Sequence, residues 1–389
     1  MNDNGLTFLS PPVVQQASAD GFTVSIEVNR LCLGRIEWGV EPDGLVHTAI
    51  SAHGGLVDAH DRCLMIPVMF SAPLDVGQPV FYRVVAESLD YATAYEVGRG
   101  KSVATSVRRL QLPHSEQAAL SLVVINDTHE DSVIVEALAR RIDALQPDML
   151  IWNGDVCRDF SAGSNPAALV LRPGADASVP SDGGWASTRP LVYVPGNHDV
   201  RGEGARLRPQ FLASGPHAGL PYSTAARIGP LALIGLDAGE DKPDHHPVFA
   251  GTAAYEPYRE RQAEWLRAQL ARPEMSQAPF KLAFSHIPLR GLPGQNDGTS
   301  LEGYARFSGH GARLWLPQLS AAGFQAIVSG HTHEWRYDKP TAEQPITQVV
   351  GGGPKHDSAT LIFIEATTEK LTIQTQDLEG ATLGSETWE

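Results

Sequence analysis

The motif that most limits the possible folds is Gly330-His331-Thr332-His333, which directly follows an apolar run at 324–328. Four further motifs rich in Asp, Asn and His also follow apolar runs of strand type. Together the five motifs contain Asp127, His129, Asp155, Asn197, His198, Asp199, His286, His331 and His333. In an α/β sheet, groups that follow the carboxyl ends of parallel strands gather at one edge. We therefore expect a scaffold that brings five loop tips to one point, where they hold two metal ions.

The region around these motifs alternates strands and helices. Residues 120–125 are apolar apart from Ser121, and the next segment has Ile134, Leu138 and Ile142 at helical spacing. Asp131 or Ser132 is the expected N-cap of that helix, and Pro147 ends it. A strand at 148–152 follows, so the order is strand, helix, strand, as in α/β domains. Further strands are predicted at 191–194, 231–236, 281–284, 346–350, 360–365 and 371–375, and further helices at 259–271 and 313–321.

The first 110 residues have a different pattern. Apolar residues alternate with polar ones in short runs, such as Phe22, Val24, Ile26 and Val28, and Gly, Pro and Asp separate the runs. This pattern predicts a small all-β sandwich. No cluster of metal-ligand residues is found there. We predict two domains, at 1–115 and 116–389, with a long loop or small excursion at 160–189 on the active-site side and a second long loop at 287–311.

The charge balance excludes one class of partner. The 389 residues include 30 Lys and Arg against 45 Asp and Glu, a formal net charge of -15, which argues against a nucleic-acid surface. The three cysteines lie far apart and are expected to be reduced thiols in a cytoplasmic protein. The first residues do not resemble a signal peptide, and no apolar run approaches the roughly 20 residues of a membrane helix. The sequence leaves the oligomeric state open.

The five motifs can form two ligand sets. Asp127 and His129 lie two residues apart after a strand and can bind one ion with Asp155 and His333. Asn197, His286 and His331 can bind a second ion and share Asp155 with the first. Oxygen and nitrogen ligands without thiolate suit Mn, Fe, Zn or Ni, and a shared carboxylate suits the two-metal spacing of about 3.5–4 Å.

The motifs read D-x-H, G-D, G-N-H-D, H and G-H-x-H, and their order resembles that of the calcineurin-like metallophosphoesterase family over residues 118–375. This resemblance implies an α/β fold of four layers, a metallophosphoesterase sandwich ordered α-β-β-α. It also implies the ligand assignment above and a role for His198 other than metal binding.

The N-terminal region resembles the fibronectin type III-like domain that precedes the catalytic domain of purple acid phosphatases. Trp38-Gly39 and Phe81-Tyr82-Arg83-Val84 carry this similarity. Two positions depart from the purple enzymes, which have Gly in place of His129 and Tyr in place of Arg158. Without that tyrosine, a coloured ferric-phenolate centre is not expected.

The expected function is a metal-dependent phosphoesterase with a small phosphorylated substrate. Metal-activated hydroxide attacks phosphorus, His198 protonates the leaving oxygen, and Asp199 orients the His198 ring. Monoesters and diesters both remain open, including nucleotide-type or cyclic diesters, and Arg201 is equally compatible with a phosphate contact and a surface position. One alternative is a dinuclear hydrolase of non-phosphate substrates, but in such enzymes the histidine-rich motif comes early in the chain. The other is a vestigial binding protein, which would be expected to have lost some of the metal ligands. Neither condition holds here.

Overall fold

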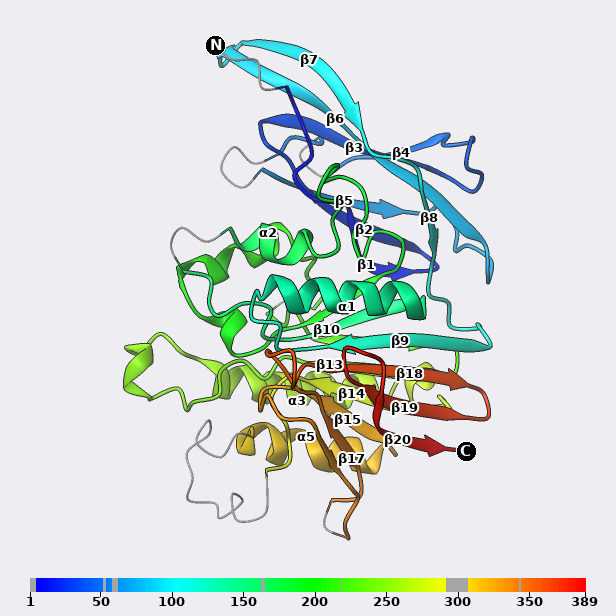
Figure 1. Cartoon of the computed structure of the whole chain (residues 1–389), viewed down its shortest axis with the longest axis vertical. Helices are drawn as coiled ribbons and strands as arrows, with labels where there is room; N and C mark the ends of the chain where they lie inside the picture. The colour runs from blue at the N-terminus through cyan, green and yellow to red at the C-terminus, as the bar shows by residue number, and fades with distance from the viewer. Residues whose placement is uncertain are drawn as a thin grey trace.

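The computed structural model describes residues 5–51, 54–57, 62–161, 165–217, 219–291, 307–342 and 344–389 (Figure 1). Most of the predicted loop at 287–311 lies outside these residues. None of the described helices is long and apolar enough to cross a membrane.

The first sheet has nine strands among the described residues, in the order β20-β19-β18-β9-β10-β11-β1-β2-β5. Strands β9, β10, β11 and β1 are mutually parallel neighbours, and the other pairs are antiparallel. The predicted tail strands are present, and one further strand, β20, follows them. The bounds are β1 Val13–Ser18, β2 Gly21–Glu27, β5 Cys63–Met69, β9 Ala119–Ile125, β10 Met149–Asn153, β11 Leu191–Val194, β18 Leu361–Thr367, β19 Leu371–Gln376 and β20 Thr382–Trp388.

The second sheet has the order β12-β13-β14-β15-β17-β16 and a parallel centre from β13 to β17. Its strands are β12 Thr224–Ile228, β13 Leu231–Leu236, β14 Phe280–Ser285, β15 Ala326–Ser329, β16 Arg336–Asp338 and β17 Thr347–Val350. Leu122 and Val124 of the first sheet share a buried apolar cluster with Leu233 and Leu282 of the second. The two sheets therefore face each other across this core.

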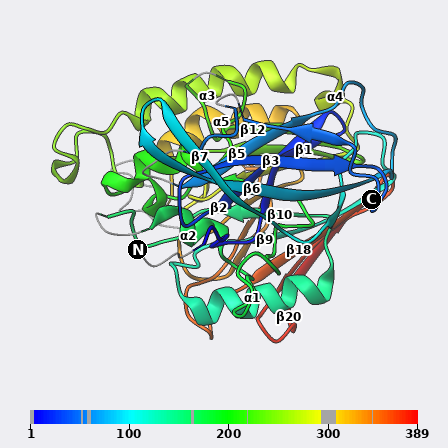
Figure 2. The same ribbon diagram turned by 90° about the horizontal axis from the view of Figure 1, so that it is seen from above.

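Helices cover the outer faces. Helix α1 (Ser132–Leu145) packs on the first sheet, and α3 (Tyr255–Leu270) and α5 (Gly309–Ala321) pack on the second. Figure 2 shows α1 and α3 on opposite sides of the molecule. The Asp131 carboxylate caps α1 as predicted, by accepting from two backbone amides. The short α4 (Pro273–Ser276) follows α3, and three 3₁₀ turns, η1 His198–Val200, η2 Glu203–Gln210 and η3 Pro247–Phe249, lie between β11 and α3.

Helix α3 begins four residues before its predicted start. The carboxylate of Asp244 accepts hydrogen bonds from the backbone amides of Tyr255 and Glu256, at 2.8 and 3.0 Å. These two donors belong to the first turn of the helix and have no partner within it. A cap eleven residues upstream is a tertiary contact, which local sequence patterns do not predict.

The N-terminal strands form a third sheet in the order β4-β3-β6-β7, with β8 paired to β6. These strands are β3 Cys32–Gly39, β4 His47–Ala49, β6 Pro79–Thr93, β7 Glu96–Ala104 and β8 Arg108–Gln111. One apolar cluster fills the space between this sheet and β1, β2 and β5, and it includes Phe22, Ile26, Ile36 and Tyr82. The N-terminal third is therefore built largely of strands around a core of its own.

Sheet hydrogen bonding crosses the predicted boundary at residue 115. Strand β1 pairs with β2 on one side and with β11 on the other, where Gln15 lies opposite Leu191. The Gln15 amide also donates to the carbonyl oxygen of Phe211, and its own oxygen accepts from the Ala213 amide. The division into two domains stays a prediction, and these bonds couple the two parts.

The segment at 160–189 is not only a loop. Its middle forms α2 (Pro166–Leu171), which packs against β2. Asn165 and Arg172 flank this helix, and both donate to the carboxylate of Glu27. This part of the predicted active-site loop therefore lies against the N-terminal strands.

Candidate metal centre

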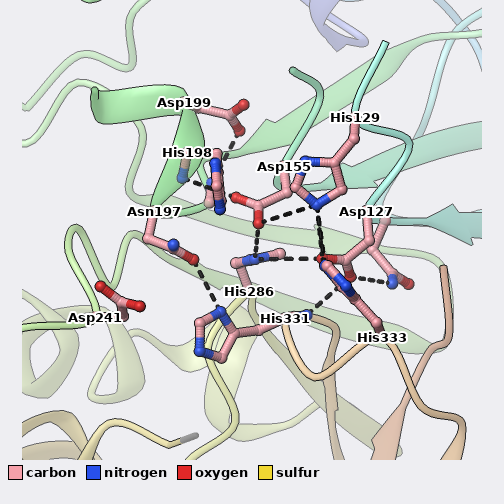
Figure 3. Close-up of polar contacts among 12 residues, drawn as sticks. Asp127, His129, Asp155, Asn197, His198, Asp199, Asp241, His286, His331 and His333 are labelled. Carbon is pink, nitrogen blue, oxygen red and sulfur yellow. Dashed lines mark hydrogen bonds and ion pairs between the residues drawn. The ribbon is translucent and has the colours of Figure 1, made fainter. Parts of the chain in front are cut away.

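The seven predicted metal ligands lie in loops that follow five strands. Asp127 and His129 follow β9, Asp155 follows β10, Asn197 follows β11, His286 follows β14, and His331 and His333 follow β15. The first three strands belong to the first sheet and the last two to the second, so both sheets contribute to one site. Figure 3 shows these side chains directed toward one another.

The first group consists of Asp127, His129, Asp155 and His333, whose ligand-type atoms all lie within 4.8 Å of one another. His333 Nε2 is 3.3 Å from Asp127 Oδ1 and 3.0 Å from His129 Nε2. His129 Nε2 is 3.7 Å from Asp155 Oδ2. The His333 side chain is 43% exposed, whereas the other three are buried, so this group lies at the solvent side of the site.

The second group consists of Asp155, His286 and His331 and shares Asp155 with the first. His286 Nε2 lies 3.2 Å from Asp155 Oδ2. Asn197 joins this group, because its Oδ1 is 2.9 Å from His331 Nδ1. The structure thus brings the predicted ligands together in two groups, which correspond to the two predicted ligand sets and share Asp155.

Two buried atoms at the centre favour a cation. Asp127 Oδ1 and His286 Nε2 have no hydrogen-bond partner within the described part of the chain, and they lie 3.8 Å apart. His286 Nδ1 donates to the Asn153 carbonyl oxygen at 2.7 Å, which leaves Nε2 as the free ligand atom. A buried carboxylate oxygen without a donor is costly unless a positive charge faces it. The donor set of carboxylates, an amide oxygen and imidazoles fits divalent transition-metal ions.

The ionisable groups affect one another strongly. Burial alone would raise the pKa of Asp127 and of Asp155, but the positive charge of His286 holds the pKa of both below the ordinary value. Burial opposes protonation of His286, yet the two carboxylates raise its pKa to about 10. Burial and the charge of His286 lower the pKa of His331 to about 4. The carboxylates therefore create a strongly negative field that draws positive charge to this point.

The backbone is strained where the ligands lie. Five of the seven predicted ligands, Asp127, His129, Asp155, His331 and His333, have positive φ, between 44° and 72°. Left-handed backbone at residues other than Gly costs of order 1–3 kcal/mol each and persists only where the surrounding structure enforces it. Its concentration in these loops is typical of a functional site.

The glycines of the motifs mostly provide space. Of the three before Asp155, Asn197 and His331, only Gly154 has positive φ. A Cβ on Gly196 would lie 2.2 Å from Asp155 Oδ1, and one on Gly330 would lie 2.4 Å from Asp127 Oδ2. These two glycines therefore let the backbone approach the carboxylates closely.

His198 lies beside the cluster, and a backbone group holds its ring. Its Nδ1 donates to the Arg158 carbonyl oxygen at 2.6 Å, and its own backbone amide donates to Asp155 Oδ1 at 2.9 Å. The Asp199 carboxylate instead accepts from the backbone amides of Val156 and Gly196, both at 2.9 Å. The contact predicted between Asp199 and the His198 ring is thus made by Arg158, and Asp199 ties two metal loops together.

Arg201 reaches His198 and is not a free surface arginine. Its Nη1 lies 3.3 Å from His198 Nε2, while Nε and Nη2 donate to the Glu240 carboxylate at 2.7 and 2.8 Å. Nη2 also donates to Asp241 Oδ1 at 2.8 Å. Burial disfavours the charged arginine, but the two carboxylates raise the pKa of Arg201 above its ordinary value. Glu240 was not predicted as a site residue, although it lies in a visibly acidic stretch.

The sequence profile of the calcineurin-like phosphoesterase family matches residues 120–335. Among solved structures, GAP50, "the anchor in the inner membrane complex of Plasmodium", is 17% identical, with a TM-score of 0.46, and the match covers 69% of this chain and 88% of that chain. A dimetal phosphatase from Danio rerio is 12% identical, with a TM-score of 0.45 and coverage of 69% and 98%. No protein of curated function matches the sequence.

Proposed function

The chain belongs to the calcineurin-like phosphoesterase family, and on this premise we propose that it hydrolyses small phosphoric esters with the help of two divalent metal ions. The observation that supports this most directly is the pair of ligand groups that share Asp155. Monoesters and diesters, including nucleotide-type or cyclic diesters, are both within the proposal.

Asp127, His129, Asp155 and His333 would hold one ion, and Asp155, Asn197, His286 and His331 the other. Ions bound there supply Lewis-acid stabilisation of the phosphate oxygens and lower the pKa of a water molecule to about 7. The residues of this chain hold these ligands in place. The His331 amide donates to Asp127 Oδ2 at 2.8 Å, and Asn126 Nδ2 donates to the same oxygen at 2.6 Å. Asp127 Oδ1 is thereby left to face the ion.

His198 is the proposed proton donor to the leaving oxygen. Because its Nδ1 donates to the Arg158 carbonyl oxygen, Nε2 is the nitrogen that faces a leaving group, and the form that donates is the imidazolium, which carries a second proton on Nε2. Asp199 acts at a distance, by holding the loops of Val156 and Gly196. Arg201, anchored by Glu240, lies at the same nitrogen and is positioned to contact the phosphate or the leaving group.

Further parts of the proposal concern the architecture and the partners. Helix α1 packs on the first sheet, the two sheets share a core, and α3 and α5 pack on the second sheet, which supports the four-layer α-β-β-α arrangement. The strand pairing of the third sheet, around a core shared with β1, β2 and β5, supports the fibronectin type III-like assignment. We also propose a cytoplasmic location and no nucleic-acid or membrane partner, on the basis of the thiols and the net charge of -15.

The test is turnover of chromogenic phosphomonoester and phosphodiester substrates after reconstitution with Mn²⁺, with elemental analysis of the same preparation. We expect two ions per chain and hydrolysis of at least one substrate class. Two bound ions without phosphoester turnover, but with hydrolysis of a lactone or amide, would favour the non-phosphate hydrolase. At most one ion and no turnover would favour a vestigial binding protein.

A further inference from the structure

A pocket of about 520 Å³ lies beside the candidate metal centre. Its lining includes Arg201, Arg206, Lys242, Phe249 and Tyr255, contributed by the segment after β11, by the loop after β13 and by the start of α3. This volume is within the range of about 300–1,000 Å³ that small-molecule sites occupy.

Arg201 connects the pocket to His198. Arg201 lines the pocket and places Nη1 3.3 Å from His198 Nε2, the nitrogen proposed to donate the proton. Arg201 therefore links the proposed proton donor to the pocket, which makes the pocket a candidate site for the leaving group of an ester bound at the metal centre.

Two of the three cations that line the pocket are already neutralised. Arg201 pairs with Glu240 and Asp241, and Lys242 Nζ lies 2.7 Å from Asp241 Oδ1. Arg206 is exposed, and among the residues that the structure places no acidic side chain forms an ion pair with it. Its guanidinium is therefore available to a negative group of a ligand.

Two aromatic residues also line the pocket. The start of α3 fixes Tyr255, because its backbone amide donates to Asp244 Oδ1. Its ring lies over Gly239, where a Cβ would come within 2.1 Å of Tyr255 Cδ1. Burial raises the pKa of Tyr255 to about 12, so the phenol stays neutral and does not repel an anion. Phe249 adds a second aromatic side chain.

We propose that this pocket binds the leaving group of the substrate, and that the preferred substrates are phosphoric esters of a ring compound that carries a second negative charge, bound by Arg206. The inference rests on the proposed function and adds the class of leaving group to it. A carboxylate and a second phosphate present the same chemistry to a guanidinium, so the test begins with a carboxylate and repeats the comparison with a phosphate.

The experiment compares 4-nitrophenyl phosphate with 3-carboxy-4-nitrophenyl phosphate in the Mn²⁺-reconstituted protein. We expect the carboxylated substrate to have the higher kcat/KM. Arg206→Gln should reduce this preference by about tenfold, mainly through KM, because a charge-assisted hydrogen bond to the carboxylate is lost. The matched control is Arg267→Gln, an exposed arginine of α3 outside the pocket, which makes the same change in net charge. A bisphosphorylated ring substrate should show the same dependence on Arg206.

A binding measurement separates failure of the pocket from failure of the proposed reaction. Calorimetric titration with the carboxylated nitrophenol alone should show binding to the wild type that Arg206→Gln weakens by about tenfold and Arg267→Gln leaves unchanged. Turnover of neither monoester, and of no chromogenic phosphodiester in the same preparation, would overturn the proposed function, while this titration would still judge the pocket. If the wild type and both variants hydrolyse the two esters with the same ratio of kcat/KM values, and bind the carboxylated nitrophenol equally well, the proposed role of the pocket is wrong and the proposed function still stands.

Discussion

Two regions of the molecule bury different kinds of side chain: the loops that follow β9, β10, β11, β14 and β15, and the space between the N-terminal strands. At the loops, carboxylates and imidazoles, most of them buried, lie within 4.8 Å of one another in each ligand group, and the backbone is repeatedly left-handed. Between the third sheet and β1, β2 and β5, the interior consists of packed apolar side chains such as Phe22, Ile36 and Tyr82.

The difference shows how one chain divides stability and function. Apolar burial stabilises each residue by roughly 1.5–3 kcal/mol without demanding an exact partner. A buried carboxylate is favourable only when positive charge and hydrogen bonds surround it. We therefore expect substitutions in the loops to change metal content and rate, and substitutions among the N-terminal strands to change stability alone.

The largest effect is expected at Asp155, which both ligand groups share. Asp155→Asn keeps the shape but cannot bridge two ions as a carboxylate does. We expect fewer than two ions per chain by elemental analysis and a kcat lower by about 10³-fold or more, since metal ions contribute several kcal/mol to transition-state stabilisation. Glu365→Gln, an exposed residue of β18, is the control for loss of one negative charge. Two retained ions and a near-normal kcat would remove Asp155 from the bridging position.

His198 and Asn197 test the comparison within a single loop. Asn197 Oδ1 faces His331, whereas the His198 ring faces Arg158 and Arg201. His198→Ala should keep the metals and lower kcat by about 10²–10⁴-fold, with a smaller loss for nitrophenyl esters, which need less proton donation. Asn197→Ala should weaken metal binding, and part of its activity should return at high metal concentration. Loss of metal from His198→Ala, or an equal defect with good and poor leaving groups, would reassign His198 as a ligand or a phosphate contact.

Phe22 tests the other side of the comparison. Its ring is buried in the N-terminal core, with its centroid 5.5 Å from that of Tyr82. Phe22→Ala should lower the free energy of unfolding by about 3–5 kcal/mol in urea titrations, because a cavity replaces the ring. The kcat of the folded fraction and its metal content should stay within about twofold of the wild type. A large fall in kcat without a fall in stability would show that this core acts on the site through β1 and β11.

Phe22→Ala is a cleaner test than removal of the N-terminal region. A chain reduced to residues 116–389 is still expected to keep both metals if it folds. However, the truncation takes away β1 and leaves the edge of β11 without a partner. An unpaired edge strand favours association between chains, so aggregation of that fragment would not bear on the metal site.

The sequence predicted those parts of the site that depend on local order along the chain. Each ligand motif directly follows an apolar run, so the strand and the ligand at its end are visible together. Helix α1 was equally accessible, because its apolar spacing, the Asp131 cap and Pro147 are all local. The assembly of the motifs into two groups was predicted from the residue types and their spacing, and the family resemblance implies the same assignment.

The parts that were missed depend on backbone groups or on distant residues. The carbonyl oxygen of Arg158 holds the His198 ring, and any residue at that position offers the same atom. Strand β1 joins β11 through a pairing of residues that are more than 170 positions apart, and the short segment Val13–Ser18 has no pattern that names its partner. The anchoring of Arg201 by Glu240 likewise spans two loops that only the fold brings together.

The smallest effect is expected from an ion pair on the third sheet, where charge contributes least. Burial would raise the pKa of Glu37, but Arg83 and Arg35 together hold it below the ordinary value. A carboxyl with a lowered pKa stabilises the folded state above its ordinary pKa, and that contribution is lost as the pH falls through the folded-state pKa. The side chains of Arg35 and Arg83 are 36% and 41% exposed, respectively, so solvent screens their attraction to Glu37. Glu37→Gln should therefore cost only about 0.5–1 kcal/mol at pH 7.

The control for this prediction is Glu41→Gln, which removes an exposed carboxylate of the same region. Urea midpoints of the two variants and the wild type, measured from pH 7 downward, should show the deficit of Glu37→Gln shrinking as the pH falls from the ordinary Glu pKa through the lowered folded-state pKa, below which the wild-type carboxyl is neutral in both states. Added salt should reduce the deficit at pH 7, because ions in solution screen the attraction between exposed charges. A loss of unfolding free energy well above 2 kcal/mol in Glu37→Gln would mean that this ion pair stabilises the N-terminal strands as strongly as apolar packing does. The two regions would then differ only in metal binding.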